Sequence, residues 1–442
     1  MSPSAIAVVG CVHGELDTVY AACQAAEAEH GVKIGLVLLT GDIQAVRAPA
    51  DLETMAVPLK YRVMGDFWKY ASGAAVAPYL TLCIAGNHEA SSHMHQLPAG
   101  GWIAPNIWYM GRAGVVWWRG LRIGAWSGIY DHRDFHTPHD PTPAWSHESA
   151  VRSVYHTRAV DGWRLAGLTP AVDIFMSHDW PGGIAHAGDI QSLIAQKPLF
   201  EADIASGKLG SPPAAQLLQT LKPARWFASH LHIKWSACVH HMLDARAEAA
   251  GSARATQFLA LDKAVPGRAF LQLLPAPAAV AGWSLPDSVI AYDAEWLAIL
   301  RATAGSEPSP QSGLPVVDCE QVRSAAAEAA AAAAATAEDA DGFTETPDLP
   351  DAPTDGQCTA AWLRALAERC PVSSAHPCAL PDMPAYTPAE PEFQGNLDAK
   401  QRQHLPAWGY PDERVPPPTA LPIHLPPGIP ATLVEPASSS TS

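Results

Sequence analysis

The sequence has no unbroken apolar run of about 18 residues, the length that a membrane-spanning helix requires. Its first residues also lack the basic stretch followed by an apolar stretch that marks a secretory signal peptide. The eight cysteines are scattered and form no close framework, which in a chain of 442 residues indicates reduced thiols rather than disulfides. These absences predict a soluble intracellular protein without membrane contact.

Basic residues are scarce, because 28 Lys and Arg stand against 44 Asp and Glu, and the net charge of −16 argues against nucleic-acid binding. The acidity is concentrated, however, in residues 304–442, which hold 19 of the acidic but only 6 of the basic residues. The first 303 residues therefore carry a net charge of only −3 and can present a local basic patch.

The composition changes near residue 304. Residues 324–342 are rich in alanine, and the sequence beyond them is rich in proline and acidic residues, which is typical of a chain that forms no core. We expect residues 304–442 to be a mostly disordered, low-complexity tail, with residues 359–370 as a short helix or a docking peptide. The tail cysteines Cys358, Cys370 and Cys378 are spaced too loosely to predict a zinc site.

Residues 1–275 alternate short apolar runs with polar loops. Runs that are apolar over most of their length predict buried strands at residues 5–10, 34–42, 79–87, 121–128, 172–178, 224–230 and 256–262. Helical patterns lie between some of them, for example at residues 15–30, and a further helix is expected at 291–300. This alternation predicts a layered α/β domain with a mainly parallel or mixed sheet.

Five of these runs end in polar side chains that can bind metals. The residues are Cys11, His13, Asp42, Asn87, His178, His230 and His232. Ligand and catalytic residues collect at the carboxyl ends of strands in such sheets. Two divalent metals about 3.5–4 Å apart can clamp a phosphodiester, and a carboxylate such as that of Asp42 can bridge them. His88, which follows Asn87, is then free to act as a general acid.

Each of these residues alone also has a structural interpretation. A histidine at a strand end is more often a hydrogen-bonded residue, Cys11 could be a small buried apolar residue, and Asp42 and Asn87 could serve in turns. The joint order of Cys-x-His, Gly-Asp, Gly-Asn-His-Glu, Ser-His-Asp and His-x-His favours a metal site. The histidines without a partner pattern are expected to be structural or solvated: His93, His95, His132, His136, His240 and His241.

The motifs GD, GNHE and HLH, in this order, resemble the calcineurin-like metallophosphoesterases, whose fold is an αββα β-sandwich flanked by helices. The longer stretches GNHEAS, GGWIAPNIWYMG, SHDWP and ASHLHIKW resemble the RNA lariat debranching enzymes, and this resemblance spans residues 5–303. It implies hydrolysis of the 2′–5′ phosphodiester at the branch point of excised intron lariats by a metal-activated hydroxide. His88 would then protonate the leaving 2′ oxygen.

The resemblance also implies two metal pockets that share Asp42. One pocket would consist of Cys11, His13, Asp42 and His232, and the other of Asp42, Asn87, His178 and His230. A thiolate among the ligands suits zinc, whereas a pocket of nitrogen and oxygen ligands accepts iron or manganese. We therefore expect Fe(II) and Zn(II), with Mn(II) as a substitute.

By the same resemblance, residues 1–275 form the catalytic domain, 276–303 a C-terminal segment of the debranching enzymes, and 131–151 the lariat recognition loop. The expected contacts to the branched RNA are His139, Trp145, Arg152 and Arg158. The loop departs from the usual family pattern, so solvated charges explain the two arginines equally well.

Three functions stay open on the sequence alone. The leading hypothesis is a debranching enzyme in the nucleus, with the cytoplasm as an additional location. The altered recognition loop favours a phosphoesterase for another substrate, namely a nucleotide, a DNA end or a phosphoprotein. A non-catalytic scaffold of the same fold is disfavoured, because all the expected ligands and His88 are present.

Overall fold

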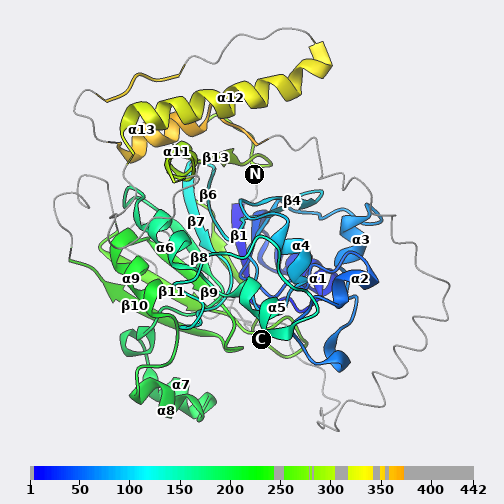
Figure 1. The fold of residues 1–442 in the computed structure, drawn as a ribbon. Coiled ribbons are helices and arrows are strands. Elements are labelled where there is room, and N and C mark those ends of the chain that lie inside the picture. The colour runs from blue at the N-terminus through cyan, green and yellow to red at the C-terminus, as the bar shows by residue number, and fades with distance from the viewer. Residues whose placement is uncertain are drawn as a thin grey trace, which may run out of the picture.

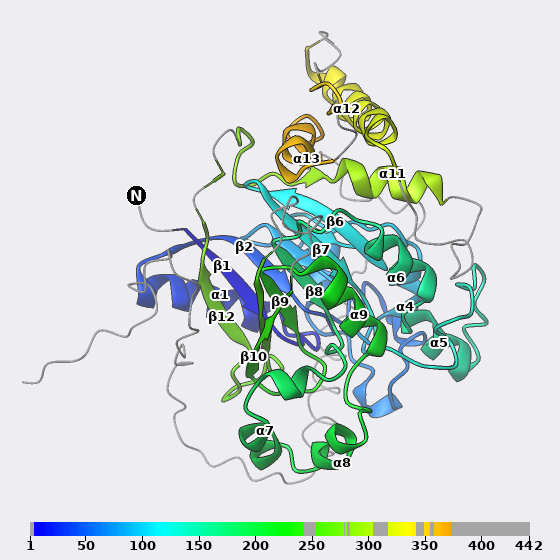
Figure 2. The same cartoon turned by 90° about the vertical axis from the view of Figure 1, so that its left-hand side faces the viewer.

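A computed structural model describes residues 4–242, 253–277, 279–280, 283–303, 317–341, 349–353 and 358–372. Within them the chain forms two β-sheets that lie face to face, with helices on both outer sides (Figures 1 and 2). This αββα arrangement confirms the sandwich predicted from the sequence.

The first sheet has six strands in the order β12-β1-β2-β3-β5-β4. Their bounds are β1 Ser4–Val9, β2 Lys33–Leu39, β3 Thr81–Cys83, β4 Gly101–Ala104, β5 Ile107–Tyr109 and β12 Leu271–Pro275. Neighbouring strands from β1 to β5 pair in parallel, while β12 and β4 close the two edges in antiparallel fashion.

The second sheet has seven strands in the order β10-β11-β9-β8-β7-β6-β13. Their bounds are β6 Ala113–Trp118, β7 Leu121–Trp126, β8 Ile174–Ser177, β9 Arg225–Ala228, β10 Trp235–His240, β11 Ala255–Ala260 and β13 Ala291–Tyr292. Its central strands β7, β8, β9 and β11 pair in parallel, and antiparallel strands flank them on both sides.

The predicted strand runs correspond to β1, β2, β3, β7, β8, β9 and β11, each within a few residues. They were recognisable because both faces of these strands are buried. In β1, Ile6 and Val8 belong to the core between the sheets, together with Ile174 of β8. The alternate residues Ala7 and Val9 belong to the core beneath the helices of the first sheet.

Helices cover the outer face of each sheet. Those of the catalytic region are α1 Leu16–His30, α2 Pro49–Leu52, α3 Phe67–Ala71, α4 Ser91–His95, α5 Glu148–Tyr155, α6 Ala159–Ala166, α7 Ile190–Gln196, α8 Phe200–Ala205 and α9 Pro212–Leu221, with short 3-10 helices η1 Leu59–Tyr61 and η2 Ile184–Ala187. Residues of α1, α3 and α4 pack on the first sheet, and residues of α6 to α9 pack on the second. Across the described residues, every helix is too short or too polar to cross a membrane.

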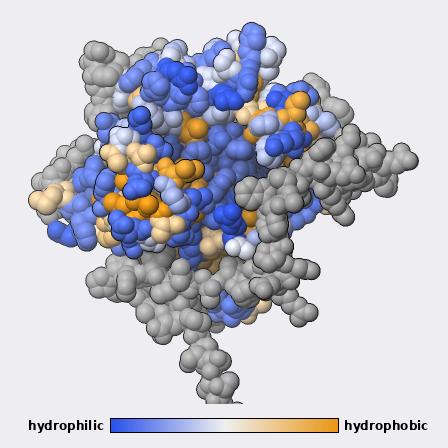
Figure 3. Space-filling view, turned by 90° about the horizontal axis from the view of Figure 1, so that it is seen from below, coloured by the Kyte–Doolittle hydropathy of each residue, from blue (hydrophilic) through white to orange (hydrophobic). Residues whose placement is uncertain are grey.

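Helices α7 and α8 project from one end of the molecule (Figure 1). Leu199, between them, is 89% exposed. Seen from that end, the described surface is mostly hydrophilic, with separate apolar areas of which the largest lies on the left (Figure 3). The apolar surface at this end is therefore local rather than continuous.

Within residues 304–442, the short helix expected at 359–370 is present, whereas a longer packed helix differs from the expected low-complexity tail. Helices α12 Cys319–Asp341 and α13 Ala360–Ala367 pack with α11 Ala294–Ala302 at the edge of the second sheet (Figure 2). Their shared core includes Val322 and Leu366, both fully buried. The expectation of disorder for residues 373–442, which include Cys378, lies outside the described residues.

Candidate metal centre

The loops that follow β1, β2 and β3 of the first sheet meet those that follow β8 and β9 of the second. They carry the residues expected from the sequence: Cys11, His13, Asp42, Asn87, His88, His178, His230 and His232. The backbone N–H of His13 donates to the carbonyl of Asp42 at 2.6 Å, which joins the first two loops. The backbone N–H of His230 donates to the Cys11 thiol sulfur at 3.2 Å, which joins the two sheets.

One group of side chains matches the first expected pocket. The ligand atoms of Cys11, His13, Asp42 and His232 all lie within 4.8 Å of one another. Nε2 of His13 lies 3.0 Å from Nε2 of His232 and 3.6 Å from Oδ2 of Asp42. Such convergence of a thiol, two imidazoles and a carboxylate is the donor set of a tetrahedral zinc-type site.

The second expected pocket lies on the other side of the Asp42 carboxylate. Nε2 of His178 lies 3.2 Å from Oδ1 of Asp42, and the ring of His230 is 5.1 Å from that of His178. Among the described residues, neither Nε2 of His178 nor Oδ1 of Asn87 has a hydrogen-bond partner, although both atoms are buried. Buried polar atoms without partners are rare and need an explanation, and a cation between them satisfies both.

The orientation of His178 is fixed by its other ring nitrogen. Nδ1–H donates to the carbonyl oxygen of Thr40 at 2.8 Å, and Ser229 donates to the same oxygen from its hydroxyl at 2.8 Å. The hydrogen bond to Thr40 leaves Nε2 facing the Asp42 carboxylate, whose charge raises the pKa of His178 against the effect of burial. A hydrogen bond from the non-ligating nitrogen is the usual device that orients a metal-binding histidine.

Burial sets the protonation of the side chains. It lowers the pKa of His13 to about 4 and that of His232 to about 3, so both imidazoles are neutral at neutral pH and can donate a lone pair. Burial opposes ionisation of Asp42, but the neighbouring His178 and His13 hold its pKa well below the usual range. Burial, together with the charge of Asp42, raises the pKa of the Cys11 thiol, so a cation is needed to displace its proton.

The backbone of the ligand loops is strained. Four of the expected ligands have a positive φ, in the left-handed region: His13 at 50°, Asp42 at 51°, His230 at 57° and His232 at 50°. Each non-glycine residue in this region costs on the order of 1 kcal/mol, and such strain gathers at functional sites. The strain therefore supports a functional role for these loops.

Glycines allow the side chains of Asp42 and His178 to lie close to the backbone of the ligand loops. A Cβ at Gly41 would lie 2.2 Å from Nδ1 of His178, and φ at Gly41 is 113°. A Cβ at Gly86 would lie 2.1 Å from Oδ1 of Asp42. The glycines of the Gly-Asp and Gly-Asn-His-Glu motifs are thus required by the geometry of the site.

Glu89 is a residue that the sequence analysis missed. It is fully buried, and its carboxylate accepts the backbone N–H groups of Ile43 at 2.8 Å, Ala45 at 3.2 Å and Gly86 at 3.2 Å. Burial, with the nearby charge of Asp42, raises the pKa of Glu89 to about 7. Glu89 is a positioning residue, since it ties the Asp42 loop to the loop of Asn87. Its place in the GNHE motif was the available signal.

His88 lies beside the ligands rather than among them. Its side chain is partly exposed, and its ring is 4.9 Å from that of His13 in an edge-to-face arrangement. Its backbone N–H donates to Oδ1 of Asp42 at 2.8 Å, which fixes its position relative to the shared carboxylate. The imidazole is therefore available to a molecule bound at the cluster.

The residues expected to contact RNA lie in different environments. His139 places Nε2 at 2.6 Å from Oδ2 of Asp161, and the ring of Trp145 is 5.6 Å from that of His95. Arg152 is exposed and ion-pairs with Glu148, one helical turn earlier.

Arg158, in contrast, is only 2% exposed. Its guanidinium donates to the carbonyl oxygens of His156 and Ser153, both at 2.8 Å, and to the Ser153 hydroxyl at 2.7 Å. Most of its donors therefore bind the end of α5, and a contact between Arg158 and RNA stays a prediction. Arg158 was expected at the surface since the sequence alone does not reveal which loop arginine turns inward.

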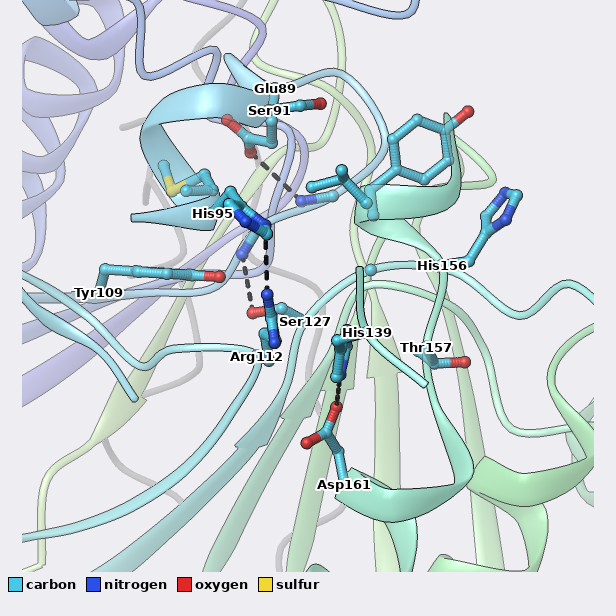
Figure 4. Close-up of a pocket in the computed structure, with 16 residues that line it drawn as sticks. Glu89, Ser91, His95, Tyr109, Arg112, Ser127, His139, His156, Thr157 and Asp161 are labelled. Carbon is cyan, nitrogen blue, oxygen red and sulfur yellow. Dashed lines mark hydrogen bonds and ion pairs between the residues drawn. The ribbon is translucent and has the colours of Figure 1, made fainter. Parts of the chain in front are cut away.

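A pocket lies beside the cluster, and His139 of the expected recognition loop contributes to its wall. Gly86 and Glu89 contribute to its wall, so it adjoins the loop that carries Asn87 and His88. Figure 4 shows Arg112 and His95 pointing toward one another, and His139 pointing toward Asp161. A molecule held at the cluster can therefore extend into this pocket, whose lining includes Arg112, His139 and Asp161.

Two family models match the sequence. The model described as "Calcineurin-like phosphoesterase" matches residues 4–234, and the model described as "Lariat debranching enzyme, C-terminal domain" matches residues 253–347. The second match extends beyond residue 303 and includes α11 and α12. Sequence similarity to this family therefore continues into helices that pack together at the edge of the second sheet.

Curated proteins with similar sequences carry the name of the same enzyme family. The human (Homo sapiens) "Lariat debranching enzyme" is 48% identical over 298 residues, which cover 67% of this chain and 53% of the relative. The Danio rerio enzyme of the same name is 47% identical over 298 residues, covering 67% and 51%. The Arabidopsis thaliana enzyme is 48% identical over 296 residues, covering 67% and 68%. The chain therefore spans about half the length of the two vertebrate relatives.

Proposed function

The chain belongs to the calcineurin-like phosphoesterases and, within them, to the lariat debranching enzymes, and from this premise we propose that it hydrolyses the 2′–5′ phosphodiester at the branch point of lariat RNA. The observation that carries this proposal is the convergence of the expected ligands and His88 at one edge of the sandwich. A site of this composition is suited to phosphodiester hydrolysis assisted by two metals.

We propose that Cys11, His13, Asp42 and His232 hold one divalent metal, and that Asp42, Asn87, His178 and His230 hold the other. The unpartnered buried atoms of Asn87 and His178 support the second pocket. Two divalent metals bound there would polarise the phosphodiester and lower the pKa of a water molecule. The Cys11 thiolate favours Zn(II) in the first pocket, and the nitrogen and oxygen ligands favour Fe(II) or Mn(II) in the second.

The residues of the chain then supply orientation and a proton. Asp42, held by His178 and by the backbone of His88, keeps the two pockets adjacent. His88 donates a proton to the leaving 2′ oxygen while water adds to phosphorus. The products are a free 2′-hydroxyl on the branch nucleotide and a 5′-phosphate on the nucleotide that had been joined to it.

The test of this function compares a synthetic 2′–5′ branched RNA with linear 3′–5′ RNA of the same sequence. We expect cleavage at the branch and little cleavage of the linear strand. Comparable rates on both substrates would contradict the proposal and favour a general phosphodiesterase.

The first predicted variant is His88→Ala. Loss of the general acid is expected to lower kcat on branched RNA by about 10²–10⁴-fold, with metal content and binding of branched RNA retained. Exposed His240, at the far end of β10, provides the control variant His240→Ala, which should keep wild-type kcat. Steady-state rates, metal analysis and a binding assay give the three readouts. If His88→Ala loses metal together with activity, His88 acts as a ligand and not as the acid.

A second candidate function is hydrolysis of another phosphoester, such as a nucleotide, a DNA end or a phosphoprotein. Arg152 is paired with Glu148 and Arg158 is buried, so the two arginines expected to contact RNA offer fewer free donors than the sequence suggested. Faster hydrolysis of one of these substrates than of branched RNA would establish this alternative. A non-catalytic scaffold would show less than about one metal per chain and no activity after purification without oxygen.

We also propose that the protein resides in the nucleus. The support for this location is the substrate class, since introns are excised there. Imaging of a fluorescent fusion of the full chain tests it, and an exclusively cytoplasmic signal would overturn it.

A further inference from the structure

Arg112 is a partly buried arginine without an ion-pair partner. It lies between β5 and β6, in the wall of the pocket beside the metal centre. Its guanidinium makes one hydrogen bond, from Nη2 to Nδ1 of His95 at 3.2 Å, and among the described residues no carboxylate lies within ion-pair distance of it. By contrast, the buried Arg47 is ion-paired with Asp51 and the buried Arg122 with Asp293. A partly buried guanidinium whose one partner is a neutral imidazole keeps donors free for an anion.

The neighbours of Arg112 hold it in place without neutralising it. Nε2–H of His95 donates to the carbonyl oxygen of Pro141 at 3.2 Å, which leaves Nδ1 as an acceptor for Arg112. The acidic side chains around the pocket are already occupied. Asp161 faces His139 at 2.6 Å, and Glu89 accepts its backbone N–H groups. The guanidinium nitrogens that do not bind His95 are therefore available to a ligand.

The pocket walls carry further donors without acceptors. Among the described residues, the hydroxyls of Ser91 and Thr157 are buried and unpartnered, and both residues line the same pocket as Arg112. An adjoining cavity is lined by Arg112, His139 and Arg158, and Nε of Arg158 is also buried without a partner. Arg158 is 98% buried, so water at the surface does not satisfy this nitrogen. Convergent hydroxyl and guanidinium groups that keep donors free are suited to the recognition of a phosphate.

We propose that this pocket binds a phosphodiester of branched RNA other than the scissile one, with Arg112 as its charged ligand. The inference rests on the proposed function and deepens it. A branch nucleotide carries phosphodiesters on its 2′, 3′ and 5′ oxygens, whereas a nucleotide of linear RNA lacks the one on the 2′ oxygen. When the 2′ phosphodiester lies at the metal centre, a neighbouring phosphate of the same nucleotide enters the adjoining pocket. Arg112 thereby contributes to the preference for branched over linear RNA.

The first test measures substrate preference in Arg112→Leu. Its readout is the ratio of kcat/KM on branched RNA to kcat/KM on bis(4-nitrophenyl) phosphate, a small diester that lacks any second phosphate. A lost charge-assisted hydrogen bond is worth about 10- to 100-fold, so we expect this ratio to fall by that factor through a higher KM for RNA. Arg112→Lys, which keeps the charge, should recover part of the loss.

Arg225 offers a matched control. It is also partly buried and has no ion-pair partner among the described residues, but it begins β9, at the opposite end of that strand from His230. Arg225→Leu should leave the substrate ratio within about twofold of the wild type while reproducing the general effect of removing a buried arginine. An equal loss on both substrates in Arg112→Leu, or no loss on either, overturns the pocket proposal.

The second test locates the phosphate. Branched RNAs are prepared with one neutral methylphosphonate at a time, at each position except the scissile bond. One of these replacements should weaken RNA binding by the wild-type protein as much as the Arg112→Leu substitution weakens binding of unmodified RNA. The same replacement should not weaken RNA binding by Arg112→Leu any further. Additive effects at every position would overturn the inference while the proposed function stands. Absence of cleavage of unmodified branched RNA by the wild type would instead contradict the proposed function.

Discussion

Gly86 lies against the centre of the metal site, and a single methyl group there meets two of its functional atoms. A Cβ would lie 2.1 Å from Oδ1 of Asp42 and 2.6 Å from Nε2 of His178. Gly86→Ala is therefore expected to displace these side chains and to lower metal affinity by about 10- to 100-fold, the usual effect of disturbing the support of a ligand. Metal content after dialysis against buffered metal measures this effect.

The matched control is Gly73→Ala. Gly73 also has a positive φ, 76°, but a Cβ there would meet nothing within 4 Å. This variant should keep its metals despite the backbone strain. Wild-type metal affinity in Gly86→Ala would show that the Asp42 loop relaxes without loss of the site.

His93 is the second residue-scale case, and it makes stability depend on pH. It is buried, and Nδ1–H donates to the carbonyl oxygen of Ala45 at 2.8 Å. Burial and the charge of Arg47 lower its pKa to about 4, against 6.5 in the unfolded chain. The unfolded chain thus binds the proton first, so stability is fully present above pH 6.5 and is lost as the pH falls toward 4. Linkage gives a loss of about 3 kcal/mol over this window.

His93→Gln, which can keep a donor to Ala45, should remove this contribution. The free energy of unfolding from urea titrations at pH 7 and pH 4.5 is the measurement. The decrease between the two pH values should be smaller in His93→Gln than in the wild type, while exposed His240→Gln should behave as the wild type. An equal decrease in both variants would show that other groups cause it.

At the residue scale, the order of motifs along the chain was enough to predict which ligands come together. Cys11, His13, Asp42 and His232 were predictable because their side chains carry the chemistry. Glu89 was missed, because it acts by accepting backbone N–H groups rather than by binding metal, and its place in the GNHE motif does not reveal this role. The inward turn of Arg158 and the pairing of Arg112 with His95 depend on packing between distant loops and have no local signal.

At the scale of elements, the strands buried on both faces were predictable, as were helices α11 and α13, but the packed helix α12 was not. Helix α12 buries Val322, Ala325, Ala326 and Ala330, a stripe at helical spacing made mostly of alanine. An alanine stripe has the same composition as a disordered alanine-rich segment. A packed alanine-rich helix differs from a disordered segment only in that other helices, here α11 and α13, cover its buried side. The local sequence does not show such tertiary contacts.

Helix α11 is joined to the second sheet by a buried ion network. Arg122 of β7 is fully buried and donates to Asp293 at 2.7 and 2.9 Å and to Glu295 at 2.7 Å. Asp293 also caps α11 by accepting the backbone N–H of Trp296 at 2.8 Å. Arg122→Leu would leave two buried carboxylates unpaired, which is expected to lower the free energy of unfolding by about 3–5 kcal/mol.

Urea unfolding measures this loss, and Arg62→Leu provides the comparison. Arg62 pairs with Glu53 at 3.7 Å, and Glu53 is 83% exposed. A surface pair of this kind contributes about 0–1 kcal/mol, so its removal should be nearly neutral. If both variants lose the same small amount, the network does not anchor α11.

At the scale of the whole molecule, the ligands of the metal centre come from both sheets, with Asp42 after β2 and His178 after β8. Metals bound there would link the two layers of the sandwich, so their removal should act on global stability as well as on activity. A ligand that binds only the folded state adds about 4 kcal/mol at a thousand times its Kd. Chelation of the full chain is therefore expected to lower Tm by several degrees, and readdition of Zn(II) with Mn(II) or Fe(II) should restore it.

Hydrogen exchange locates the effect. Chelation should increase exchange in the loops that follow β1, β2, β3, β8 and β9 together, since each contributes an expected ligand. In Cys11→Ser, chelation should produce a smaller change in Tm, because the first pocket has lost its thiolate and binds metal more weakly. Exchange that rises in the loops of one sheet only would show that the metals do not connect the two layers. A Tm independent of chelator would show that the strained ligand loops are held by the protein alone.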